Sequence, residues 1–387
     1  MTQPIPERTD HISNEAQSTS ALSGPNAPVY AVDLVFEGGA MHGIALVGAL
    51  AVLEERGFQR MHMAGTSAGA IIAVLYAAGY TAVELYDLIS YPFKNFLDRN
   101  IPIPGLNAPI GILTHLGLYK GDALEQQLRE WLAAKGVRTF RDLRHDKFKN
   151  DPAAISHYKV QVIVSDITQK QLLVLPRDYA VLGYADGDEI DVASAVRMSA
   201  SIPFFFDPVH VRNAQTSETH LLVDGGLLSN YPIWLFDSPT IPRWPTFGLR
   251  LMDQDPSVEG ATMVGAMLPN DGNPNIVQYI ESLIGTLVKA HDKMYIEAAN
   301  FARTIAIPTL GTNGIDFNMP PEVVKALYQS GRDAATQFLA SWDFQAYIAE
   351  FRSTKPHMSR REALTQRMRH TLHEAAEGDH PEAAPTI

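Results

Sequence analysis

The chain has 387 residues, of which 46% are hydrophobic and 19% are charged, so it can bury a sizeable core and does not have the composition of a disordered protein. Its net charge of −12 argues against a nucleic-acid binder, which needs a basic face, and against purely electrostatic docking on anionic lipid. The lack of cysteine excludes disulfides, thiolate catalysis and cysteine–zinc sites.

Residues 1–28 form a polar stretch, which we expect to be a disordered tail. This stretch contains no apolar run of signal-peptide length. The sequence also lacks the run of about 18 apolar residues that indicates a transmembrane helix. We therefore expect a cytoplasmic protein, and export without a cleaved signal stays open.

The region after this tail alternates strands and helices. Residues 30–36 (YAVDLVF) predict a buried strand that ends at a glycine pair, and residues 43–57 predict a helix with a glycine stop. Residues 60–65 predict a short second strand, and residues 67–79 an almost wholly apolar and deeply buried helix. This alternation is typical of α/β organisation with parallel strands.

Residues 91–119 form a long apolar stretch that Pro and Gly interrupt. Two interpretations stay open, namely plain core, or a lid or interfacial surface that admits lipid chains. Residues 359–372 place their apolar side chains on one helical face, which suits either a transient contact with a membrane surface or an ordinary surface helix.

Between and beyond these segments, the pattern predicts four more helical regions and five more strands. The helices are expected at about 121–135, 189–203, 276–303 and 320–351, and the strands at 159–167, 171–176, 220–226, 245–251 and 302–308. The first two of these strands suit a hairpin. The simplest organisation is one α/β hydrolytic domain at 29–310, C-terminal helices at 311–373 packed on it, and a flexible tail at 374–387.

A serine stands between two glycines where the second predicted strand meets the second helix. The run Gly65-Thr66-Ser67-Ala68-Gly69 matches the nucleophile elbow, a sharp turn that strains the serine backbone and exposes its hydroxyl. Large side chains at the two glycine positions would clash with the neighbouring helix and strand. The helix N-terminus would favour a developing oxyanion. The alternative is that Ser67 only caps the helix.

A second glycine-rich turn, “EGGAMHG” at 37–43, joins the first strand to the first helix. Such a turn can direct several backbone N–H groups toward one anion, which in acyl transfer is the oxyanion. A dinucleotide-binding loop is the rival interpretation, but Ala40 breaks its glycine fingerprint, and the Gly-Lys-Ser/Thr ending of a P-loop is missing. We therefore predict no cofactor.

Asp224 ends the strand predicted at 220–226 and precedes Gly225 and Gly226. An acid at a strand end lies where open α/β sheets place their ligands. The alternative is a turn-forming aspartate before glycine. A possible calcium loop at 271–282 lacks the glycine and glutamate of an EF-hand, so we predict no metal site.

Taken together, “EGGAMHG”, “GTSAG” and “VDGGLLSNYP”, in this order, resemble the patatin-like phospholipase family in its bacterial form. The segment “SAVRMSASIPFFFDPV” at 194–209 is also similar to that family, and the resemblance covers roughly residues 30 to 250. It implies a three-layer α/β/α fold with a mainly parallel central sheet and a helical C-terminal extension. It also implies a serine acyl hydrolase that cleaves lipid esters, of phospholipase A or lysophospholipase type, with a lipid or phospholipid as substrate. Whether an activator or an oligomer is needed stays open.

The resemblance implies roles for individual residues. Ser67 and Asp224 would form a catalytic dyad, and the oxyanion hole would comprise Gly38, Gly39 and the amide of Ala40. The motif glycines are Gly43, Gly65, Gly69, Gly225 and Gly226.

The chain departs from the family pattern twice, since the family usually has a third glycine at position 40 and Arg or Lys at position 42. Ala40 would carry strain if its φ is positive. His42 would supply a weaker, pH-dependent positive charge or lie on the helix surface.

A serine–aspartate dyad needs an aspartate that is more basic than usual. A free aspartate has a pKa near 3.9 and is a poor base for a serine hydroxyl. Burial would raise that pKa. We therefore expect Asp224 to be mostly buried and hydrogen-bonded to Ser67 Oγ.

Two alternatives remain. The first is an α/β-hydrolase with a Ser-Asp-His triad, for which the histidines after Asp224 are His291, His357, His370, His373 and His380. None of them follows a predicted strand, and α/β-hydrolases place several strands before their elbow. The second alternative is a catalytically weak acyl-lipid-binding protein, which the two departures would favour.

Overall fold

The computed structural model describes residues 30–90, 97–99, 116–151, 154–238, 240–252, 298–314 and 316–352. Several predicted segments lie wholly or mostly outside these ranges, namely 1–28, 91–119, 271–282, 276–303, 359–372 and 374–387.

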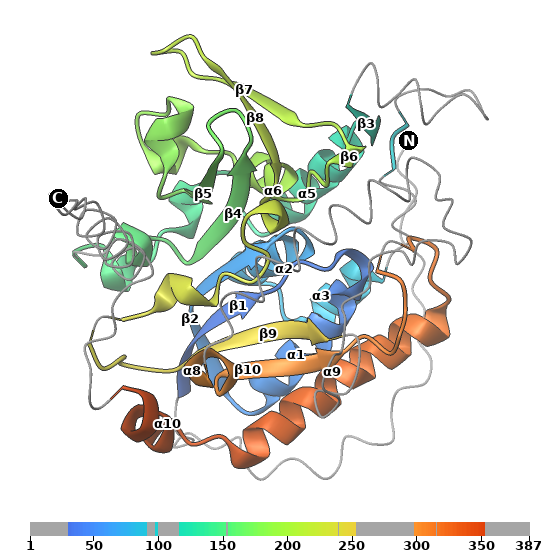
Figure 1. Cartoon of the computed structure of the whole chain (residues 1–387), viewed down its shortest axis with the longest axis vertical. Helices are drawn as coiled ribbons and strands as arrows, with labels where there is room; N and C mark the ends of the chain where they lie inside the picture. Colours follow the sequence, from blue (N-terminus) through green and yellow to red (C-terminus); the bar gives the residue numbers. More distant parts are fainter. Residues whose placement is uncertain are drawn as a thin grey trace, which may run out of the picture.

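Eight strands of the described chain form one sheet, in the order β10-β9-β1-β2-β4-β8-β7, with β5 paired to β4 off this path (Figure 1). They are β1 (Tyr30–Phe36), β2 (Phe58–Thr66), β4 (Val160–Asp166), β5 (Gln171–Leu175), β7 (Val209–Arg212), β8 (Thr219–Asp224), β9 (Thr246–Met252) and β10 (Thr304–Pro308). The strands from β10 to β4 run parallel, whereas β5, β8 and β7 pair antiparallel. The predicted α/β class with a mainly parallel sheet is confirmed, as is the β4–β5 hairpin. A separate parallel pair joins β3 (Gly117–Tyr119) to β6 (Phe204–Phe206).

The helices that were predicted within the described ranges are present, but the one predicted at 189–203 is shorter and the region predicted at 320–351 is divided into two helices. They are α1 (Gly43–Glu55), α2 (Ala68–Ala77), α5 (Asp122–Ala134), α6 (Val192–Ser199), α9 (Pro321–Ser341) and α10 (Phe344–Phe351), and the short α8 (Ala298–Phe301) ends the region predicted at 276–303. Helix α3 (Ala82–Ile89) was not predicted, although its capping box, Thr81 with Glu84, is a recognisable start signal. No helix in the described ranges is long and apolar enough to cross a bilayer.

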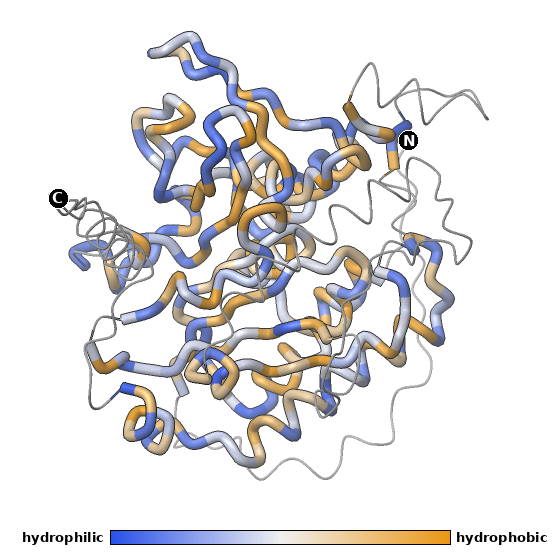
Figure 2. The backbone as a smooth tube through the Cα atoms, in the orientation of Figure 1, coloured by the Kyte–Doolittle hydropathy of each residue, from blue (hydrophilic) through white to orange (hydrophobic). Residues whose placement is uncertain are grey.

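The two faces of the sheet bury different cores, because successive strand residues point to opposite sides. Leu34 and Phe36 of β1 belong to the large core, which also contains α1, α2, α6 and α9 side chains. Val35, between them, belongs to a smaller core with Ile233 and Leu235 on the other face. Hydrophobic residues recur along the central strands, whereas the β7–β8 turn is hydrophilic (Figure 2).

The strand register aligns the glycine-rich turn, the serine and the aspartate. Phe36, the last residue of β1, pairs with Gly65 of β2, and Thr66 pairs with Ile163 of β4. The next residue of β4, Val164, pairs with Asp224 of β8. The turn after β1, the elbow after β2 and the end of β8 therefore lie in one row across the sheet.

Candidate active site

Ser67 lies between β2 and α2 with φ 54° and ψ −124°. This is a conformation that non-glycine residues rarely adopt, and it often marks a functional site. The side chain makes no capping hydrogen bond to α2. Its side chain instead interacts with the carboxylate of Asp224, and its backbone N–H donates a hydrogen bond to Ser199 Oγ at 2.9 Å. Ser67 therefore occupies the cap position of α2 without using its side chain as a cap.

The two glycines that flank Ser67 are required by close packing. A Cβ atom added to Gly65 would lie 2.3 Å from the carbonyl oxygen of Gly69, and one added to Gly69 would lie 2.3 Å from that of Phe36. The turn thus brings the first turn of α2 against β1 and β2, as expected for the elbow. Gly43 is different, because its Cβ would meet Ile72 at an ordinary contact distance of 3.4 Å.

Asp224 is buried, with 6% of its surface exposed. It accepts a hydrogen bond from the Gly226 N–H at 2.7 Å, and the Ser67 side chain also interacts with it. Burial raises the pKa of Asp224 to about 6, because desolvation outweighs the lowering effects of Ser67 and Gly226. A carboxylate with this pKa is ionised at neutral pH and is more basic than an ordinary aspartate. Gly225 packs tightly, since its Cβ would lie 2.2 Å from the Ile163 carbonyl oxygen.

The glycine-rich turn lies directly against the elbow. A Cβ on Gly38 would lie 3.2 Å from Ser67 Cβ. The N–H of Gly38 is already bonded to the Asn230 carbonyl at 3.2 Å. Within the described ranges, the N–H groups of Gly39 and Ala40 donate to no protein acceptor. The structure therefore leaves Gly39 and Ala40, rather than Gly38, as the available donors for an oxyanion.

The structure contradicts both interpretations of His42, namely a positive charge at the turn and a place on the helix surface. It is 6% exposed and therefore does not lie on the helix surface. Its Nε2 lies 2.9 Å from Thr312 Oγ1. Desolvation lowers the pKa of His42 to about 4, so the ring is neutral at pH 7 and supplies no positive charge to the turn. The tertiary packing of the 309–314 loop buries this side chain.

Ala40 adopts φ 47°, so the strain expected for alanine in place of glycine is present. We expect Ala40→Gly to raise the free energy of unfolding by about 1 kcal/mol, because glycine adopts a positive φ without a steric penalty. Chemical denaturation of the two proteins measures this difference. Ala49→Gly, in the middle of α1, is the matched control and should lower stability by about 1 kcal/mol or more. A destabilised Ala40→Gly variant would contradict the strain at this position.

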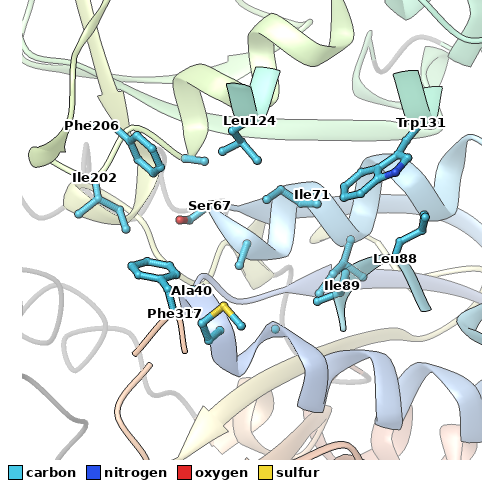
Figure 3. A pocket seen from close by; sticks show the side chains of 15 residues that line it. Ala40, Ser67, Ile71, Leu88, Ile89, Leu124, Trp131, Ile202, Phe206 and Phe317 are labelled. Carbon is cyan, nitrogen blue, oxygen red and sulfur yellow. The ribbon is translucent and has the colours of Figure 1, made fainter. Parts of the chain in front are cut away.

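Ser67 lines an apolar pocket (Figure 3). Apart from Ser67, the side chains that line it are hydrophobic: Ala40, Met41, Ala68, Ile71, Ile72, Leu88, Ile89, Leu124, Trp131, Ala200, Ile202, Phe206 and Phe317, together with the backbone of Gly43. Phe206, Ile202 and Phe317 lie on one side of Ser67. On the other side, in the direction in which α2 runs, lie Leu88 and Ile89 of α3 and Trp131 of α5. The pocket, with about 60 Å³ of accessible space, offers an apolar surface to a group bound next to the Ser67 side chain.

Most of this lining was not predicted, because it comes from segments that are far apart in the sequence. Ser199 was not assigned a role either, although it belongs to the quoted segment at 194–209. The five histidines weighed for a triad all lie outside the described ranges. Within those ranges, no three histidine or carboxylate side chains gather as metal ligands.

Comparison with known proteins gives a consistent result. The family model described as “Patatin-like phospholipase” matches residues 34–237. The uncharacterized protein YqhO of Bacillus subtilis is 36% identical over 317 residues, which cover 81% of this chain and 99% of YqhO. The probable lipid hydrolase 463L of Invertebrate iridescent virus 6 is 26% identical, over 53% of this chain and 63% of that protein. The crystal structure of VipD from Legionella pneumophila is similar with a TM-score of 0.46 and 19% identity, over 81% of this chain and 67% of VipD. Since the family model spans more than half of the chain and YqhO matches over nearly its full length, this protein belongs to the patatin-like phospholipase family.

Proposed function

We propose that this protein is a serine acyl hydrolase that cleaves carboxylic ester bonds of lipids, as a phospholipase A or lysophospholipase does. The observation that carries the proposal is the placement of Ser67 at the wall of an apolar pocket, with its side chain close enough to the buried Asp224 carboxylate to lower the pKa of Asp224. Membership of the patatin-like phospholipase family and the similarity to a probable viral lipid hydrolase support a lipid substrate.

In the first half-reaction, Ser67 Oγ attacks the ester carbonyl carbon while Asp224 accepts the hydroxyl proton. The carbonyl electron pair moves to oxygen, and the resulting oxyanion accepts hydrogen bonds from the Gly39 and Ala40 N–H groups. When the tetrahedral intermediate collapses, the bond to the alcohol oxygen breaks and Asp224 returns the proton to that oxygen. The products are a free alcohol and an acyl group bound to Ser67.

In the second half-reaction, a water molecule attacks the acyl carbon and gives one proton to Asp224. The bond to Ser67 Oγ then breaks, and Asp224 returns the proton to that oxygen. The fatty acid leaves and the resting site is restored. Asp224 suits both steps, because a base with a pKa of about 6 accepts a proton more readily than an ordinary aspartate and still releases it near neutral pH.

The pocket predicts how the enzyme would respond to acyl chain length. Ile71 lies on α2 between Ser67 and the far side chains of the pocket (Figure 3). We expect Ile71→Trp to fill this part of the pocket and to lower kcat/KM for p-nitrophenyl palmitate at least about tenfold more than for the butyrate. Displacing two methylenes costs about 1.6 kcal/mol, which corresponds to slightly more than a tenfold change.

The measurement is the hydrolysis of a p-nitrophenyl ester series and of mixed phospholipid vesicles. The matched control is Ile241→Trp, since Ile241 is an exposed isoleucine outside the pocket. If Ile71→Trp keeps the chain-length preference of the wild type, the acyl chain is not held along α2. If the wild type releases no acid from any ester, the proposed function is wrong.

A further inference from the structure

Asn230 lies between the three parts of the candidate site, six residues after Asp224. Its side chain is buried, with 6% exposed. It belongs neither to the elbow around Ser67 nor to the glycine-rich turn, and it takes no part in the reaction steps above. Its contacts nevertheless connect these two turns.

Asn230 holds both polar groups of Gly38. Its side-chain Nδ2 donates to the Gly38 carbonyl oxygen at 3.1 Å, and its backbone carbonyl accepts the Gly38 N–H at 3.2 Å. The fit is tight, because a Cβ on Gly38 would lie 2.3 Å from Asn230 Oδ1. Glycine at position 38 is therefore needed to let the asparagine side chain approach the turn.

The bond to the Gly38 carbonyl has a consequence for the next N–H. The Gly38 carbonyl and the Gly39 N–H belong to one peptide unit, which is planar and trans, so the two groups point in opposite directions. A carbonyl directed at Asn230 Nδ2 turns the Gly39 N–H away from Asn230. Within the glycine-rich turn, that N–H and the Ala40 N–H are the two that donate to no acceptor in the described part of the chain. A peptide between two glycines rotates easily, because neither residue has a Cβ to restrict it.

The same segment contacts the other two parts of the site. Asn230 Oδ1 would lie 2.9 Å from a Cβ on Gly226, whose N–H bonds to Asp224. The neighbouring Ser229 carbonyl accepts a hydrogen bond from the hydroxyl of Thr66, the residue before Ser67, at 3.0 Å. The turn that follows the aspartate thus binds the strand before the nucleophile and the glycine-rich turn at the same time.

We propose that Asn230 is a positioning residue that holds the Gly38–Gly39 peptide with its N–H directed at the oxyanion. This inference rests on the proposed function of the site. Asn230 does not touch the reacting atoms and acts through Gly39. Its loss weakens hydrogen bonding to the transition state more than binding of the ester, so kcat falls and KM stays nearly the same.

The test is Asn230→Asp in the full chain, assayed on p-nitrophenyl butyrate. The substitution keeps the size of the side chain but directs a carboxylate oxygen at the Gly38 carbonyl, which favours rotation of the peptide. We expect kcat to fall about 100-fold, the effect of losing one oxyanion donor, with KM within about twofold of the wild type. Asn230→Ala, which adds no charge, should lower kcat about tenfold and serves if the aspartate variant does not fold.

The matched control is Asn213→Asp. Asn213 is also buried and donates from Nδ2 to a carbonyl, that of Val181, at 3.1 Å, but it lies between β7 and β8, outside the pocket lining. Its kcat should stay unchanged. An unchanged kcat in both Asn230 variants, a rise in KM instead, or an equal loss in Asn213→Asp would overturn the positioning role. Wild-type protein that hydrolyses no ester would show that the proposed function itself fails.

Discussion

Replacement of Ser67 by alanine is expected to lower kcat for ester hydrolysis at least about 10⁴-fold and to abolish labelling by a fluorophosphonate. The physical reason is that the proposed reaction forms a covalent bond to Ser67 Oγ, and alanine has no atom that can replace it. The residual rate would come from the pocket and the N–H groups of Gly39 and Ala40, which still bind the ester and the oxyanion. Folding should be preserved, because the Ser67 hydroxyl caps no helix.

The comparison should include Ser330→Ala. Ser330 donates a hydrogen bond to the Pro308 carbonyl at 2.7 Å, so this control removes a bonded serine hydroxyl outside the candidate site. It should keep wild-type activity and labelling. A fluorophosphonate that still modifies Ser67→Ala would place the nucleophile elsewhere. A wild type that is labelled at Ser67 but silent on every ester would show a reactive serine and would still contradict the proposed ester hydrolysis.

Replacement of Asp224 by asparagine is expected to have two opposite effects. Activity should fall about 10³- to 10⁴-fold, because an amide cannot accept the Ser67 proton. Stability should rise at alkaline pH. The pKa of Asp224 is about 6 in the folded protein, against an ordinary value of 3.8, so burial disfavours the ionised form. The folded state thus loses stability as pH rises through 6, by about 3 kcal/mol in all, and this loss is absent from the asparagine variant.

Chemical denaturation at pH 8 and pH 4 measures the second effect. Asp224→Asn should be more stable than the wild type by up to about 3 kcal/mol at pH 8, and the difference should nearly vanish at pH 4. In the wild type, log kcat/KM should fall with unit slope below about pH 6, as Asp224 becomes protonated. Equal stabilities at pH 8 would show that the carboxylate is not desolvated.

The activity of the same variant decides between the dyad and its rival. If Asp224→Asn retains wild-type kcat, another base removes the serine proton. The triad would then have to be reconsidered, with His291 and the histidines near the C-terminus as its candidates. Loss of activity together with a gain in stability would instead identify Asp224 as a base that is kept at the expense of stability.

The order of strands and helices from residue 30 to 79 could be read from the chain, because it depends on local patterns. An apolar strand, a glycine turn and an apolar helix each leave a signal within a few residues. The elbow around Ser67 leaves a local signal in the same sense, since Gly65 and Gly69 lie two residues on either side of it, although Gly69 is required by packing against Phe36 of β1. The expected burial of Asp224 followed from chemistry, since a dyad needs a basic carboxylate.

The placement of Asp224 depended on the tertiary structure. Strand β8 runs antiparallel to β4, so the direction of β8 alone does not place Asp224 beside the carboxyl ends of β1 and β2. The pairing of Val164 with Asp224 brings it into line with the elbow. Strand pairing over some 60 residues leaves no local signal, because either direction of β8 suits the same apolar pattern.

Long-range packing also decided the chemistry of the glycine-rich turn. His42 is neutral because the loop at 309–314 buries it, and the Gly38 N–H is occupied because Asn230 folds back onto it. The pocket is assembled from the glycine-rich turn, α2, α3, α5, the segment around β6 and Phe317. Local sequence determines which backbone turns can form. Burial and hydrogen-bond partners depend instead on residues hundreds of positions away. Burial sets the charge of a group such as His42, and the partners decide whether an N–H group such as that of Gly38 is available.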